Sequence, residues 1–88
     1  GQLSNFEISK THLEELSISE LSQNYINKSI KDLQIREKTG CTVIGCKSGD
    51  LDYVINPTSD TVLTASTKLM LLGQKSQIQN FNNLFLDN

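Results

Sequence analysis

Few side chains in this 88-residue sequence could do chemistry beyond packing and hydrogen bonding. Those of most interest are Cys41, Cys46 and His12, the one histidine of the chain. A zinc site needs several Cys or His ligands at close spacing, and a Ser or Cys nucleophile needs a base beside it, so one histidine supports neither. Asp50 and Asp52 supply too few oxygens for calcium. The sequence therefore predicts no metal site and no catalytic site, and the protein is expected not to be an enzyme.

The two cysteines indicate a reducing compartment. Cys41 and Cys46 lie five positions apart in one predicted strand, so their side chains are expected on opposite faces, where they cannot pair. Each is expected to pack as a small hydrophobic group. No apolar run approaches the ~20 residues of a membrane span, and no charged-then-apolar leader is present. We therefore expect a cytoplasmic location.

Charge is balanced along the chain. Ten acids and eight bases give a net charge of −2, and Arg36 is the one arginine. Proteins that bind nucleic acid concentrate Lys and Arg on one face to displace counterions. The even distribution therefore predicts that nucleic acid is not a partner.

The length of the chain allows one domain with a thin core. A domain of this size buries only about 60% of the surface that its unfolded chain exposes, so further burial by pairing with a second copy is expected. The polar stretch Gly1–Lys10 is expected to be a partly disordered linker or a remnant of cloning. We place the folded domain at residues 11–88.

Three apolar runs between Gly40 and Gly73 predict a small antiparallel sheet. A turn at 48–50 separates the first two runs, and Pro57 ends the second. The polar stretch 58–67 is expected to be a loop in which the side chains of Val62 and Leu63 are both buried in the core. The predicted strands are 41–47, 51–56, with Leu51, Tyr53 and Ile55 on one face, and 68–72.

The segments on either side predict helices and one further strand. Residues 13–19 alternate as in a strand, although their leucines also fit one helical face. Asn27 suits a left-handed backbone, and a short helix is expected from the cap at Ser29 to a stop at Gly40. From Ser76 a second helix carries an apolar stripe that is either core or a dimer surface, formed by Ile78, Phe81, Leu84 and Phe85.

The order of these motifs resembles one known family. Ile-Asn-Lys-Ser-Ile at 26–30 leads into Leu-x-Ile-Arg-Glu-x-x-Gly at 33–40, a Val-Ile-Gly strand, a strand into Asn56-Pro57, and Leu-Met-Leu-Leu-Gly before the last helix. This pattern is similar to the RCK_C or TrkA-C domain, the C-terminal regulatory domain of potassium channels and transporters, over about Leu13 to Leu86. Two positions depart from it: Asn27 stands where Gly is usual, and Ser66-Thr67 stands where Gly-Asp is usual.

The resemblance implies a homodimeric α+β regulatory domain with a small, mostly antiparallel sheet. It would lie on the cytoplasmic side of a membrane-spanning potassium transport protein, alone or beside an RCK_N-type domain, and would couple ligand binding to gating. Some relatives bind cyclic di-AMP, so that nucleotide or another is the implied ligand, with no other cofactor. The implied ligand contacts are Ile35, Arg36 and Pro57, and the implied dimer contacts are Ile35, Tyr53 and Val54.

Two alternatives stay open. Arg36 also suits a simpler role at the end of the short helix, where a cation pairs with Glu37 or with the helix carbonyls. The domain as a whole could instead be a free-standing small-molecule-binding or interaction domain of the same fold, with no transporter attached.

Overall fold

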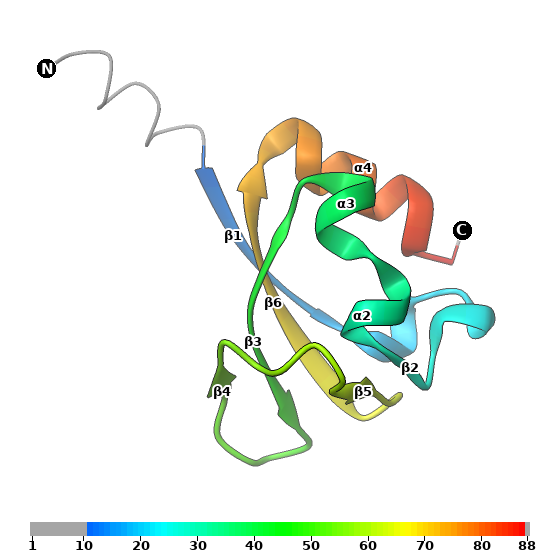
Figure 1. Ribbon diagram of the computed structural model, residues 1–88, viewed down its shortest axis with the longest axis vertical. Helices are drawn as coiled ribbons and strands as arrows, with labels where there is room; N and C mark the ends of the chain where they lie inside the picture. The colour runs from blue at the N-terminus through cyan, green and yellow to red at the C-terminus, as the bar shows by residue number, and fades with distance from the viewer. Residues whose placement is uncertain (1–10, 88) are drawn as a thin grey trace, which may run out of the picture.

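A four-stranded antiparallel sheet forms the centre of the fold in the computed structural model, which describes residues 11–87. The strands lie in the order β1-β6-β3-β4, and Figure 1 shows β6 between β1 and β3. This arrangement confirms the predicted α+β class. The expectation for residues 1–10 lies outside the described residues. The strands of this sheet are β1 (Thr11–Ser17), β3 (Thr42–Ser48), β4 (Val54–Ile55) and β6 (Thr67–Gln74).

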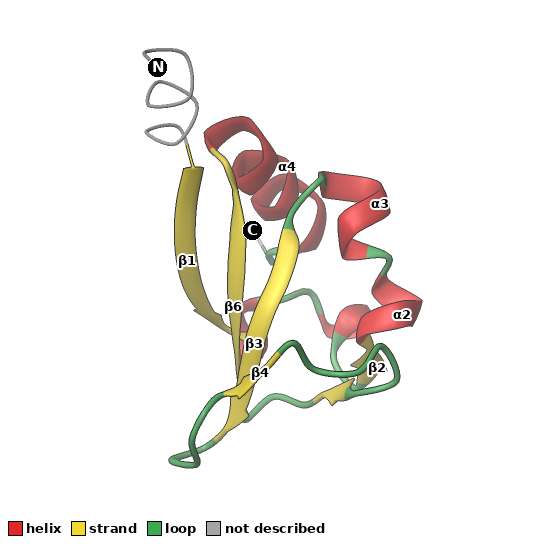
Figure 2. Ribbon diagram, turned by 60° about the vertical axis from the view of Figure 1, so that its left-hand side comes forward, coloured by secondary structure: helices red, strands yellow, loops and turns green. Residues whose placement is uncertain are grey.

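The α-helices cover one face of this sheet (Figure 2). A second, two-stranded sheet joins the segment before the first α-helix to the loop before β6. Among the described residues, no helix has the length and apolar character needed to cross a membrane. The remaining elements are the 3-10 helices η1 (Ile18–Glu20) and η2 (Gln23–Tyr25), the strands β2 (Lys28–Ser29) and β5 (Val62–Leu63), and the helices α2 (Ile30–Leu33), α3 (Ile35–Thr39) and α4 (Lys75–Phe85).

Strand β6 carries the centre of the core. Its side chains alternate, so Leu69 and Leu71 are fully buried against the helices while Lys68 points to the open face. From α4, Phe81 and Phe85 pack onto this side with their ring centroids 4.9 Å apart. The core therefore lies between β6 and α4, the two elements predicted as an apolar strand and an amphipathic helix.

A β-bulge in β3 changes the faces of the two cysteines. The register against β6 shifts between Val43 and Gly45, so the intervening Ile44 is an extra residue. Because this extra residue reverses the alternation, Cys41 and Cys46 both enter the core cluster. The prediction that they face opposite sides of the sheet was therefore wrong, although both thiols are free and buried.

The predicted helix from Ser29 to Gly40 is broken in two. Its ends are confirmed: the hydroxyl of Ser29 accepts a hydrogen bond from the Asp32 N–H at 3.1 Å, and Gly40 has φ of 85°. Between them, Gln34 adopts a left-handed backbone with φ of 51°, which separates α2 from α3. Asn27 is left-handed as predicted, with φ of 69°.

Two expectations about apolar residues were wrong in detail. Of the strand predicted over 51–56, only Val54–Ile55 forms a strand, which is β4. Leu51 precedes this strand and is 70% exposed. In β5, Leu63 is buried but Val62 is 52% exposed, because neighbouring residues of a strand point to opposite sides. On α4, Phe81 and Phe85 of the predicted stripe are buried and Leu84 is 40% exposed, so the stripe is core in part, and a dimer role for its exposed part stays a prediction. Strand β1, by contrast, confirms the choice of strand over helix for most of 13–19.

Replacing Gly40 by alanine is expected to lower the free energy of unfolding for two reasons, backbone strain and a steric clash. An alanine Cβ there would suffer the strain of a left-handed backbone and would lie 2.6 Å from the side-chain nitrogen of Gln77. Gly49 provides a matched control, because its φ is 54° but nothing lies within 4 Å of its Cβ position. Gly49→Ala should therefore lower the free energy of unfolding by about 1 kcal/mol, and Gly40→Ala by more. Urea denaturation of both variants measures the difference, and equal losses would contradict the role assigned to Gln77.

Candidate ligand-binding site

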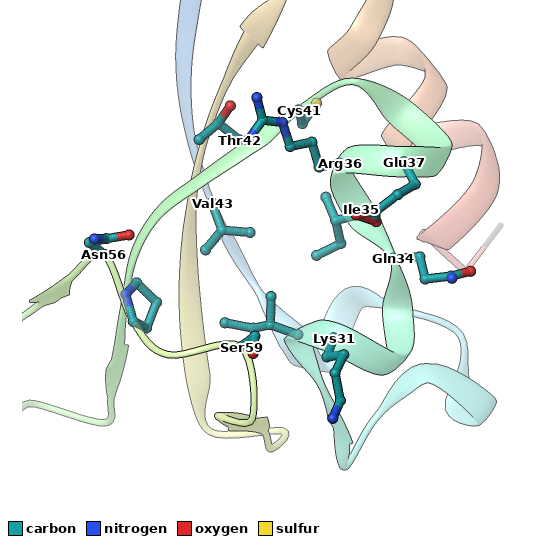
Figure 3. A pocket seen from close by; sticks show the side chains of 12 residues that line it. Lys31, Gln34, Ile35, Arg36, Glu37, Cys41, Thr42, Val43, Asn56 and Ser59 are labelled. Atoms are coloured by element: carbon teal, nitrogen blue, oxygen red, sulfur yellow. The ribbon is translucent and has the colours of Figure 1, made fainter.

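A hollow of about 460 Å³ lies between the broken helix and the loop after β4. Figure 3 shows α3 on one side of it and the segment carrying Asn56 and Ser59 on the other. The floor comes from the first residues of β3, including Val43. All three predicted ligand residues, Ile35, Arg36 and Pro57, line this one hollow. The fold thus brings together positions that are about twenty residues apart in the sequence.

Thr39 fixes the helix side of the hollow to the sheet. Its buried hydroxyl donates to the carbonyl of Ile35 at 2.6 Å and accepts from the N–H of Cys41 at 3.1 Å. Helix α3 is therefore held directly against the start of β3. Ile35, only 2% exposed, points into the core and forms part of the hollow wall, while the side chain of Arg36 stays exposed at the rim.

Backbone hydrogen bonds hold the loop side. The N–H of Asn56, which has φ of 54°, donates to the carbonyl of Ile44 at 2.7 Å. Farther on, the N–H of Lys31 donates to the carbonyl of Ser59 at 2.8 Å and thereby ties the loop to α2. These bonds give the hollow a fixed shape in the free chain, which lowers the ordering cost of binding a ligand.

The same loop is braced by its own side chains. The hydroxyl of Thr58 donates to a carboxylate oxygen of Asp60 at 2.6 Å, and this hydrogen bond lowers the pKa of Asp60. Asp60 therefore stays ionised and keeps accepting the bond at neutral pH.

Two cations and one acid line the hollow, namely Lys31, Arg36 and Glu37. The excess of positive charge favours an anionic ligand, and the guanidinium of Arg36 can hold phosphate through two parallel hydrogen bonds. The apolar part of the lining offers a surface for a flat ring, chiefly through Val43 and Pro57, because Ile35 is almost fully buried behind it. The hollow can therefore bind a molecule that carries both phosphate and an aromatic base.

Sequence reasoning missed several lining residues. Asn56 directly precedes Pro57, and its left-handed backbone is the kind that Asn tolerates best among non-glycine residues, so this signal was available. Val43 could not be assigned to the hollow from the alternation pattern, because the bulge beside it alters that pattern. Lys31 offered no signal beyond its place in the first turn of the helix.

The three residues expected at a dimer interface do not form one patch on the single chain. Ile35 is buried beside the hollow, and Val54 is 59% exposed and lines a second hollow of about 310 Å³ that shares Pro57 with the first. Tyr53 instead lies on the open face of the sheet, where its hydroxyl donates to Glu15. Their role in a dimer stays a prediction.

The comparison with protein families decides the identity of this fold. The model of the TrkA-C domain matches residues 13–86, which is nearly the whole chain. The chain belongs to the TrkA-C domain family. This finding confirms the resemblance drawn from the order of the sequence motifs.

Curated relatives of this TrkA-C domain include two potassium transport proteins. It is 40% identical over 53 residues to Potassium channel protein 1 of Methanocaldococcus jannaschii, covering 60% of this chain and 16% of that protein. It is 33% identical over 72 residues to Ktr system potassium uptake protein A of Bacillus subtilis strain 168, covering 80% of this chain and 32% of that protein. The TrkA-C domain thus spans a third or less of the length of either relative.

Solved structures share the fold at low sequence identity. The RCK C domain of potassium transport protein KtrA, in complex with cyclic diadenosine monophosphate, matches with a TM-score of 0.73 and 24% identity, covering 93% of both chains. Streptococcal BusR (S. agalactiae) in complex with its busAB-promotor DNA matches with a TM-score of 0.69 and 17% identity, covering 93% of this chain and 43% of that one. The expectation that nucleic acid is excluded as a partner is therefore not supported, because the charge of this domain says nothing about the rest of a longer protein.

Alkaline pH is expected to destabilise the TrkA-C domain through its two buried thiols. Burial raises the pKa of Cys41 and of Cys46. The folded state then holds these protons more tightly than the unfolded state. The resulting stabilisation is complete below the ordinary thiol pKa and is lost as pH rises through the folded value. Urea denaturation under reducing conditions should therefore show a free energy of unfolding that falls as pH rises above the ordinary thiol pKa of about 8.5.

A double variant provides the control for this pH dependence. Cys41→Ala combined with Cys46→Ala should lower the free energy of unfolding at neutral pH, because each change leaves a small cavity. It should also flatten the decline at alkaline pH, because the titrating groups are gone. An equally steep decline in the double variant would show that other groups cause it.

Proposed function

We propose that this TrkA-C domain is the ligand-sensing regulatory domain of a potassium channel or another cation transport protein. The observation that carries the proposal is the convergence of Ile35, Arg36 and Pro57 in one hollow with an excess of positive charge. The similarity to Potassium channel protein 1 and to Ktr system potassium uptake protein A supports the link to potassium transport. The domain would lie on the cytoplasmic side of the membrane, and the proposal gives it no catalytic role.

The proposed ligand is a cyclic dinucleotide, cyclic di-AMP, or a related nucleotide. The KtrA structure with this nucleotide shares the fold and supports the choice. A hollow of about 460 Å³ falls in the usual range for small-molecule sites. In this chain Arg36 would hold a phosphate, and Ile35 with Pro57 would contact the base.

A homodimer completes the proposed site. Cyclic di-AMP consists of two identical halves, so it matches a two-fold dimer in which each copy presents one hollow to one half of the ligand. Each hollow is open to solvent on the single chain, with Arg36 at its rim. Closure by a second copy would exclude water and strengthen the contact between guanidinium and phosphate.

Regulation then requires two dimer arrangements with different affinity for the nucleotide. A ligand shifts an equilibrium only by the ratio of its affinities for the two states. The proposed role is that nucleotide binding selects one arrangement of the dimer and so changes the potassium flux of the attached transport protein. An RCK_N-type domain in the parent chain would pass on this change.

A free-standing binding domain of the same fold is the second candidate. The two candidates differ in the reading frame of the parent gene. Membrane spans or a nucleotide-binding domain in the same frame support the transport protein, and a frame of only this domain supports the free-standing module.

Calorimetric titration with cyclic di-AMP tests the ligand assignment. The domain should bind with saturable heat, and Arg36→Ala should weaken binding by about 10- to 100-fold, because a hydrogen bond to a charged group contributes about 1.5–3 kcal/mol. Arg36→Lys should recover only part of the affinity, because an ammonium cannot make the two parallel bonds. Lys38→Ala is the matched control, since Lys38 is a cation of the same helix that does not line the hollow.

Sedimentation velocity on the same samples tests the dimer. Saturating cyclic di-AMP should shift the domain toward the dimer, and Arg36→Ala should reduce the shift. A strict monomer that shows no heat with the nucleotide would overturn the proposal.

A further inference from the structure

A hydrogen bond crosses the open face of the sheet. The hydroxyl of Tyr53, in the segment between β3 and β4, donates to a carboxylate oxygen of Glu15 in β1. The two residues are 38 positions apart in the sequence, and both β6 and β3 lie between β1 and β4, the strand that Tyr53 directly precedes. The contact therefore crosses β3 and β6 and ends at β1, the strand at the far edge of the sheet.

Gly45 provides the space that this contact needs. In the register of the sheet, Glu15 pairs with Met70, and Met70 pairs with Gly45, so all three lie in one row on the open face. A Cβ on Gly45 would lie 3.0 Å from the backbone carbonyl oxygen of Val54, 3.3 Å from the side chain of Ile55 and 3.4 Å from the ring of Tyr53. The backbone of Gly45 is not left-handed, so the glycine supplies space here, first for the close backbone of Val54 and then for the side chains of Ile55 and Tyr53 that pack over it.

The charges around the contact favour it at neutral pH. The Tyr53 hydrogen bond lowers the pKa of Glu15, with smaller contributions from Lys68 and Lys47, while desolvation and the nearby Glu15 raise the pKa of Tyr53 to about 12. Tyr53 therefore stays a donor and Glu15 an ionised acceptor. The ammonium of Lys47 lies 5.0 Å from the centre of the Tyr53 ring and adds a cation–π attraction.

The same segment continues into the wall of the hollow. Three residues after Tyr53, the N–H of Asn56 is bonded to the carbonyl of Ile44, which directly precedes Gly45. Asn56 and Pro57 both line the hollow. Residues 53–57 therefore connect the contact of Tyr53 on the open face of the sheet directly to the Asn56–Pro57 wall.

We infer that the Tyr53–Glu15 contact couples the Asn56–Pro57 wall of the hollow to strand β1. The contact holds the wall in its binding geometry, and a ligand that binds against the wall in that geometry strengthens the hold on β1 in turn. By linkage, the factor by which the contact favours the ligand equals the factor by which the ligand favours the contact. This inference rests on the proposed function for its ligand but not for the mechanical link.

Amide hydrogen exchange by NMR on the free domain tests the link without any ligand. Tyr53→Phe should speed exchange of the Asn56 amide by about 3- to 10-fold, since it removes one hydrogen bond that anchors the segment. Glu15→Gln should act in the same direction, because it removes the charge that strengthens the bond. The Gly40 amide, bonded to the Arg36 carbonyl on the other side of the hollow, is the control and should keep its rate. Unchanged exchange at Asn56, or equal acceleration at Gly40, would overturn the inference.

Calorimetry with cyclic di-AMP on the same variants tests the regulatory part. Tyr53→Phe and Glu15→Gln should each weaken binding by about 3- to 10-fold, and the double variant should be no weaker than either single one, because both remove the same contact. Additive losses would overturn the coupling. If the unaltered domain does not bind cyclic di-AMP, the ligand assignment fails, and the exchange experiment still decides the link between the wall and β1.

Discussion

The bulge in β3 is the constraint on which both the core and the candidate site depend. Without the extra residue Ile44, regular alternation would place Cys41 and Cys46 on opposite faces, and one of the two buried thiols would leave the core. The bulge also puts the carbonyl of Ile44 where the N–H of Asn56 reaches it at 2.7 Å. The extra residue thus keeps both thiols in the core and positions the Asn56–Pro57 wall of the hollow.

The helix side of the hollow, formed by α3, depends on a second set of contacts, where α3 meets β6 and α4. The side chain of Gln77 lies against Gly40 and Gly73, within 3.3 Å of the Cβ positions that these glycines lack, and it also accepts a hydrogen bond from the N–H of Gln74 at 2.8 Å. Two glycines far apart in the sequence therefore leave room for one amide side chain. Through it, the end of the helix that carries Arg36 is packed against the strand and helix that form the core.

Sequence reasoning succeeded where one residue decides the local structure. The cap at Ser29, the left-handed Asn27 and the stop at Gly40 each follow from the side chain or from its absence, and each is confirmed. It failed where tertiary contacts override local preference. Gln34 has no special tolerance for a left-handed backbone, yet it breaks the helix there. The break lets Leu33 and Ile35 both reach the core, although residues two apart point to different sides of one continuous helix.

The candidate site shows the same division between local and long-range information. The adjacency of Ile35 and Arg36 was visible in the sequence, but their approach to Pro57 depends on the bulge, which no periodic pattern reveals. Only the resemblance to a family joined these positions before the structure was known. The contact between Tyr53 and Glu15 was missed for a related reason. The ring of Tyr53 packs over Gly45, and a glycine inside an apolar run predicts a bulge or a close approach without saying which neighbour comes close. The residues that shape the proposed binding wall in so thin a domain are thus held by the sheet, so under the proposed function a ligand at the wall would act on the sheet itself.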